Sequence, residues 1–172
     1  MRLRDQSENN IMTRNIFSIN GKDYRQSAPL FLRLAIGFGF MAHGWAKLSK
    51  GPEGFEKLLT VLHIPFPHVM AWLTVLTEIL GGFAIFAGIF VSIAAVPLIC
   101  TMLVAMFSIH IHYGYSSVNT IGLTAKGPLL GPPGYEINLL YIAGLIALII
   151  TGAGKLSFDS LIALKKQAVQ SQ

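Results

Sequence analysis

Two ionisable side chains, His43 and Glu78, stand inside long apolar runs of the sequence. A charged group at the centre of a bilayer costs roughly 2.5–3.5 kcal/mol, so an ionisable residue in such a run is a functional candidate. At about 1.5 Å of helical rise per residue, both are expected at a similar depth on two different helices. Because an imidazole beside a carboxyl group can exchange its proton, we predict His43 and Glu78 as partners in proton handling. A structural pair without chemistry is the alternative.

Further polar and aromatic side chains are expected at the same level of the membrane. A quinone head group needs hydrogen-bond donors and an otherwise apolar pocket, and such residues near the ends of the apolar runs would supply both. The residues predicted to line this quinone pocket are His110, Glu136, Asn138, Trp45 and Trp72.

The histidines could also form a haem or copper site, which is the less favoured alternative to a quinone pocket. His110 and His112 are two positions apart, about 200° around a helix, so only one of them can face the pocket. That residue and His43 could together ligate haem or copper, but the chain has an ordinary number of His and Met residues. The single cysteine, Cys100, excludes a disulfide or a Cys-based metal site within one chain. We therefore predict no metal site.

A second charged pair is predicted at the other end of the same helices. Arg33 lies roughly 6 Å inside the first apolar run, and Asp159 follows the last run. The intervening glycines, Gly152 and Gly154, are expected to end the last helix and bring Asp159 back to the membrane boundary. We predict an Arg33–Asp159 ion pair with a structural role.

Composition identifies lipid as the solvent of these elements. The 172 residues are 53% hydrophobic and only 12% charged, whereas soluble domains carry roughly 25% charged residues. Four apolar runs are each about long enough to cross a bilayer as a helix. The predicted fold class is all-α, an integral membrane bundle of four transmembrane helices. The expected spans are 30–48, 70–90, 93–111 and 137–151.

Basic residues predict the orientation of this bundle. With four crossings, eight Lys and Arg residues fall on the side of the two tails and four on the side of the first and third loops, which favours N- and C-termini in the cytoplasm. They form no basic stripe, so nucleic acid is not an expected partner. The first set is Arg2, Arg4, Arg14, Lys22, Arg25, Lys155, Lys165 and Lys166; the second is Lys47, Lys50, Lys57 and Lys126.

The chain divides into one membrane domain and two tails. Residues 1–28 are expected to form a polar, mobile tail, residues 29–162 the membrane domain, and residues 163–172 a C-terminal tail. Residues 49–69 are expected to contain a short surface helix. Residues 113–134 are rich in Gly and Pro, and this loop could be either a lid over the site or a passive connector.

Several short motifs occur in an order that resembles the DoxX family, over about residues 28–162. One departure is Val91-Ser92, which stands where a basic residue often follows the second helix of that family. The motifs are Arg33, His43-Gly-x-x-Lys47-Leu48, Glu78-x-x-Gly81-Gly82 with Gly88, Gly134-Tyr-Glu136, and Gly152-x-Gly154-x-x-Ser157-x-Asp159.

The resemblance implies a four-helix, multi-pass protein of the bacterial cytoplasmic (inner) membrane, related to the small membrane subunit of thiosulfate:quinone oxidoreductase. From it we predict a component of a quinone-linked oxidoreductase or redox stress-defence system, with quinone as cofactor and a partner subunit as electron donor. Two alternatives stay open: a non-catalytic scaffold that binds a redox partner, and a small transporter that works as a homo-oligomer. The substrate, and whether the chain is itself catalytic, also stay open.

Overall fold

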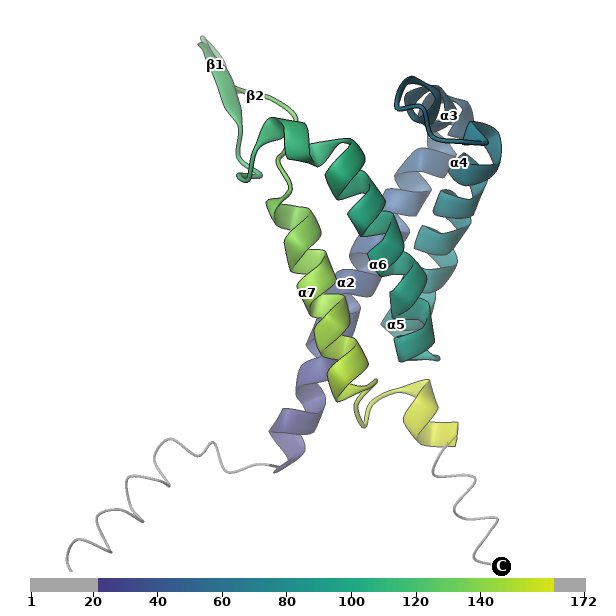
Figure 1. Ribbon diagram of the computed structural model, residues 1–172. Coiled ribbons are helices and arrows are strands. Elements are labelled where there is room, and N and C mark those ends of the chain that lie inside the picture. Colours follow the sequence, from purple (N-terminus) through teal and green to yellow (C-terminus); the bar gives the residue numbers. More distant parts are fainter. Residues whose placement is uncertain (1–21, 163–172) are drawn as a thin grey trace, which may run out of the picture.

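The computed structural model describes residues 22–162, which are mostly helical (Figure 1). Four long helical segments are joined by one short helix and by a loop that carries a β-hairpin. The long segments are α2 (Lys22–Ser49), a continuous run of α4 (Pro67–Leu76), η1 (Thr77–Gly81) and α5 (Gly82–Ala87), then α6 (Val91–Ser108) and α7 (Glu136–Thr151). The connecting elements are α3 (Pro52–Val61), the 3₁₀ turn η2 (His110–Tyr113), and the strands β1 (Thr120–Thr124) and β2 (Gly127–Leu130).

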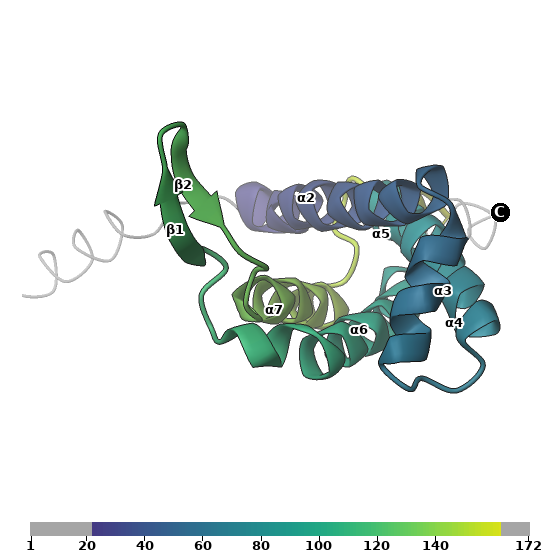
Figure 2. The same ribbon diagram turned by 90° about the horizontal axis from the view of Figure 1, so that it is seen from above.

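The long segments form two pairs. α2 packs against η1 and α5, and α6 packs against α7, while α2 also contacts α7 where they cross. Figure 1 shows α3 and the hairpin at the same end of the molecule, and Figure 2 shows them on opposite sides of that end. The start of α2 and the segment after α7 lie at the opposite end (Figure 1). The structure therefore has two distinct ends, which we call the α3 end and the tail end.

Small residues allow the close packing of α2 on α5. A Cβ added at Gly37 would lie 2.6 Å from the backbone nitrogen of Phe86 and 2.7 Å from the carbonyl oxygen of Gly82. Only glycine permits this approach of two backbones, a common device in membrane helices. The buried core then continues through Phe40, Ile85 and Leu98 to Leu145.

The outer surface of the helices is strongly apolar. Pro67–Ala87 and Val91–Ser108 are long and apolar enough to cross a membrane, and only 28% and 22% of their most apolar stretches are buried within the structure. Exposed residues such as Leu80 and Ile93 would be unfavourable in water over so large an area. The helix α7 is equally apolar but has 16 residues, about 24 Å. These features are consistent with a helical membrane protein.

The turn between the second and third segments differs from the expected one. It lies at residues 88–90, with Gly88 (φ 76°) and Phe90 (φ 46°) in left-handed conformations, and Val91 and Ser92 belong to α6. The N–H groups of Gly88 and Ile89 both donate to the carbonyl of Ala84, which satisfies the last turn of α5. The second segment therefore ends at Ala87, three residues before the expected position 90. The third segment ends at Ser108, three residues before the expected position 111.

The loops and tails show further differences from the expected organisation. The surface helix expected in residues 49–69 is α3, and the loop 113–134 contains a two-stranded antiparallel hairpin that an all-α fold does not include. Helix α2 begins at Lys22, inside the expected tail 1–28. It therefore extends eight residues before the start of the apolar run expected at residues 30–48. The remainder of that tail, residues 1–21, and the tail 163–172 lie outside the described residues.

Candidate functional site: a lysine–glutamate pair on a π-turn

Glu78 is placed inside the bundle by an irregularity in its own helix. Residues Thr77–Gly81 form a single π-turn within the otherwise α-helical run Pro67–Ala87. Such a turn carries an extra residue and rotates the side chains that follow it, and π-turns are frequent at functional sites. The Glu78 side chain is 2% exposed, so its carboxylate is withdrawn from lipid and requires a partner.

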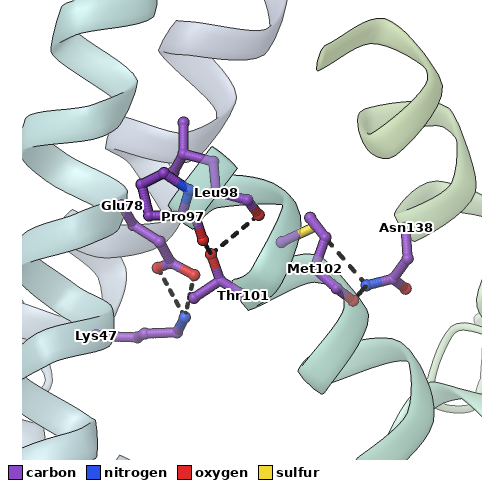
Figure 3. Close-up of polar contacts among 7 residues, drawn as sticks. All are labelled: Lys47, Glu78, Pro97, Leu98, Thr101, Met102 and Asn138. Atoms are coloured by element: carbon purple, nitrogen blue, oxygen red, sulfur yellow. Dashed lines mark hydrogen bonds and ion pairs between the residues drawn. The ribbon is translucent and has the colours of Figure 1, made fainter. Parts of the chain in front are cut away.

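The partner of Glu78 is Lys47, near the end of α2. Lys47 Nζ lies 2.5 Å from Glu78 Oε1 and 2.7 Å from Oε2, and the contact is drawn in Figure 3. Both carboxylate oxygens therefore accept from one ammonium group. Because two opposite charges held this closely offset much of each other's desolvation cost, the pair can persist inside an apolar bundle.

Two further elements border the pair. The ring of Phe55 on α3 has its centroid 4.7 Å from Lys47 Nζ, which is within the range of a cation–π contact. On the other side, α6 packs against η1, and the Thr101 side chain of α6 is directed toward the pair in Figure 3. The Thr101 hydroxyl shares its proton between the carbonyl oxygens of Pro97 and Leu98, within its own helix. The lysine, the acid and the aromatic ring of the site thus come from α2, η1 and α3, with α6 packed beside them.

The predicted pairing of His43 with Glu78 is wrong. The His43 side chain is exposed, and its ring lies 6.3 Å from that of Tyr141 on α7. Lys47 lies about one helical turn further along α2, and its longer side chain reaches back to the carboxylate. From the sequence, we interpreted Lys47 only as one of the basic residues that set the orientation in the membrane. The available signal was that Lys47 and Glu78 are the one lysine and the one acid inside the four expected spans.

The residues predicted to complete a pocket with Glu78 make contacts of other kinds. His110 Nδ1 lies 2.9 Å from the carbonyl oxygen of Pro133. Glu136 Oε2 accepts from the backbone N–H and the hydroxyl of Ser117, so it secures the loop 113–134. Asn138 donates to the carbonyl of Met102, a contact between α7 and α6 shown in Figure 3. All three residues join α6, α7 and their loop and do not surround Glu78.

The two tryptophans face outward. Trp45 is 65% exposed and Trp72 is 39% exposed. Their positions near the α3 end of α2 and α4 are typical of tryptophans at the boundary between lipid and water. We therefore assign them to the lipid-facing surface and not to the walls of a pocket around Glu78.

The predicted ion pair between Arg33 and Asp159 is not a close contact in the structure, although the two groups interact electrostatically. The buried Arg33 guanidinium donates to the carbonyl oxygens of Ile85 and Phe86 on α5. It also donates to the carbonyl oxygens of Ala153 and Leu156, after α7, at 2.5 and 2.8 Å. Asp159 instead accepts from the backbone N–H of Phe90. Arginine has five donors and can bind several carbonyls at once, so it forms a structural junction at the tail end.

Metal ligands do not cluster in the part of the chain that the structure describes. No group of three or more His, Cys, Asp or Glu side chains within residues 22–162 could hold a metal ion.

Fold and site together define a helical membrane protein with a buried acid–base pair. The family model DoxX matches residues 28–111, close to half of the chain, which supports membership of the DoxX family. The match includes Arg33, Lys47 and Glu78, whereas the motifs after residue 111 lie outside it. The chain is also similar to an uncharacterized protein of Haemophilus influenzae, with 29% identity over 137 residues, covering 77% of this chain and 82% of that protein. No solved structure matches the chain at a significant level.

Proposed function

We propose that the chain is the membrane component of a quinone-linked redox system, and that Lys47 and Glu78 form its quinone-binding and proton-transfer site. The observation that carries this proposal is the buried ion pair on the π-turn of the second helical segment. An acid that is 2% exposed in an apolar bundle is seldom idle. It is held by a lysine that keeps some access, with a side chain 26% exposed.

The chemistry of a quinone fits such a pair. Reduction of a quinone to a quinol takes two electrons and two protons, and each carbonyl oxygen becomes a hydroxyl. The Lys47 ammonium can donate a hydrogen bond to one quinone oxygen, and Glu78 can release or accept a proton as the oxidation state changes. Electrons would pass to or from a partner redox subunit, because Lys47 and Glu78 offer no redox chemistry of their own.

We also propose the membrane arrangement. All four long segments cross the bilayer, both tails lie in the cytoplasm, and the protein is a multi-pass component of a bacterial inner membrane. The pairing of Lys47 with Glu78 supports this orientation, since one of the four basic residues assigned to the opposite side is neutralised inside the bundle. The count of Lys and Arg residues then becomes eight on the side of the tails against three on the opposite side. This difference follows the positive-inside rule more clearly. The pair then lies in the outer half of the membrane.

The test is to purify the full chain in a mild detergent and to identify bound quinone by mass spectrometry. We expect quinone to co-purify with the wild-type chain and to be lost from Glu78→Gln, because glutamine keeps the shape of the side chain but cannot carry the charge or the proton. Glu53→Gln on the exposed face of α3 is the matched control and should retain quinone. Full retention of quinone by Glu78→Gln would refute the site.

A scaffold function is the second candidate, and the hairpin favours it. Ile121, Leu123, Leu129 and Leu130 are between 50% and 84% exposed on β1 and β2, where they lie beyond the ends of α6 and α7 (Figure 1). Exposed apolar side chains of this kind suit a protein partner. Recovery of a stoichiometric partner, lost when Leu123 and Leu130 are changed to Ser, together with absence of quinone, would favour this function over the first.

A further inference from the structure

The Lys47 ammonium group is enclosed by two kinds of partner. Its N–H groups donate to both oxygens of Glu78, at 2.5 and 2.7 Å. A lysine has three N–H donors, and the ring of Phe55, 4.7 Å away, covers the nitrogen from α3. The Lys47 side chain is 26% exposed with the ring in place, and a quinone oxygen would reach more of the nitrogen if the Phe55 ring moved aside.

The helix that carries Phe55 is bounded by unusual backbone conformations at both ends. Gly51, immediately before α3, has φ 83°. In the connection to α4, His63 and Phe66 have φ 56° and 51°, left-handed values that non-glycine residues rarely adopt. Such conformations cluster in segments that change conformation. The ends of α3 are therefore suited to act as hinges.

The helix α3 packs mainly against α4 and lies outside the main buried core. Leu59 is its one buried residue, 5% exposed, and an exposed contact of 2.8 Å joins Glu56 Oε2 to His68 Nδ1 on α4. The neighbouring Leu58 and Val61 are 40% and 72% exposed. A ten-residue helix with a single buried residue can detach at a lower free-energy cost than a core helix.

We propose that α3 is a lid over the Lys47–Glu78 site and that Phe55 is its gate. With the lid closed, as in the structure, the ring of Phe55 lies 4.7 Å from Lys47 Nζ and covers part of the ammonium group. When α3 swings about Gly51 and the His63–Phe66 connection, one N–H of Lys47 becomes available to an oxygen of the bound quinone. The identity of this ligand rests on the proposed function above, whereas the gating of Lys47 does not.

The experiment measures how fast Lys47 reacts with a small apolar acylating ester. The full chain in lipid nanodiscs is treated with the reagent, and acylation is read at each lysine by peptide mass spectrometry. Lys57, exposed on α3, serves as the internal reference. We expect Phe55→Ala to raise the ratio of Lys47 to Lys57 acylation about two- to fivefold, the factor that corresponds to loss of a cation–π contact. Phe55→Tyr retains the ring and should restore the wild-type ratio.

Phe31→Ala is the matched control, because Phe31 is an exposed phenylalanine near the tail end of α2 and belongs neither to α3 nor to its hinges. An unchanged ratio in Phe55→Ala, or an equal rise in Phe31→Ala, overturns the gate. Quinone content is measured on the same samples. A raised ratio without bound quinone supports the gate and refutes the quinone proposal, whereas bound quinone with an unchanged ratio does the reverse.

The contact between Glu56 and His68 gives an independent test of the lid. Glu56→Gln removes the charge that joins α3 to α4, so the lid should open more often and the acylation ratio should rise, by less than in Phe55→Ala. Glu53→Gln changes an acid in the first turn of the same helix and should leave the ratio unchanged. Equal ratios in the two variants would show that this contact does not hold the lid.

Discussion

Lys47 and Arg33 are two cations in the same helix, α2, and they are accommodated in opposite ways. Lys47 at the α3 end binds one carboxylate, and both groups can change their charge. Arg33 at the tail end donates to four carbonyl oxygens from α5 and from the segment after α7. The arginine holds its charge at all physiological pH values. The tail end is therefore a fixed junction, whereas the α3 end holds the pair that we propose responds to a ligand or a proton.

The largest expected effect is at the fixed junction. Arg33→Met removes four hydrogen bonds and leaves buried carbonyl groups without a donor, so the free energy of unfolding should fall by about 4 kcal/mol or more. Arg33→Lys should recover only part of this loss, because an ammonium group has three donors and no planar fork. Thermal unfolding in detergent, followed by circular dichroism, measures both variants. Equal stability of Arg33→Met and wild type would show that the junction contributes nothing.

A smaller effect is expected from breaking the pair at the α3 end. Lys47→Met leaves Glu78 buried without a cation, which should cost about 3 kcal/mol or somewhat less, since Glu78 can take up a proton and become neutral. Adding Glu78→Leu removes the uncompensated acid, and the double variant should return to within about 1 kcal/mol of the wild type.

The same two variants separate stability from function. The double variant, stable in thermal unfolding, should still lack bound quinone, because both polar groups of the proposed site are gone. If the double variant were stable and also retained quinone, the pair would be a structural contact like Arg33, and the contrast between the two ends would not hold.

The smallest effect concerns the glycine that accommodates Arg33. Gly88 has φ 76°, and an added Cβ would lie 2.6 Å from Arg33 Cζ and 2.7 Å from Ser157 Cβ. Gly88→Ala should therefore lower the free energy of unfolding by about 1–3 kcal/mol. Gly122→Ala in the hairpin is the control, since nothing lies within 4 Å of its added Cβ; it should change stability by less than about 0.5 kcal/mol. Similar losses in both variants would argue against close packing at Gly88.

Much of the helical organisation followed from local sequence. Apolar runs of about 20 residues identified the membrane segments, because backbone groups in lipid must bond within a helix. The family resemblance followed from ordered motifs, of which those before residue 111 lie within the family match. The turn after the second segment was misplaced, because Gly88 and Phe90 both adopt left-handed conformations within an apolar stretch that carries no polar turn signal. The hairpin was not predicted, because the Gly and Pro residues of this loop are typical of turns and not of β-strands.

Residue type alone showed that Glu78 and Arg33 need partners, since a charged group in lipid cannot be left unpaired. Their partners depended on three-dimensional placement. Matched depth suggested His43 for Glu78, but depth along a helix says nothing about which side the residue faces, and the π-turn turned Glu78 toward Lys47. Arg33 donates to carbonyl groups of α5 and of the segment after α7, because these two parts of the chain meet beside it. Contacts between distant segments require the packed helices, which no local pattern encodes.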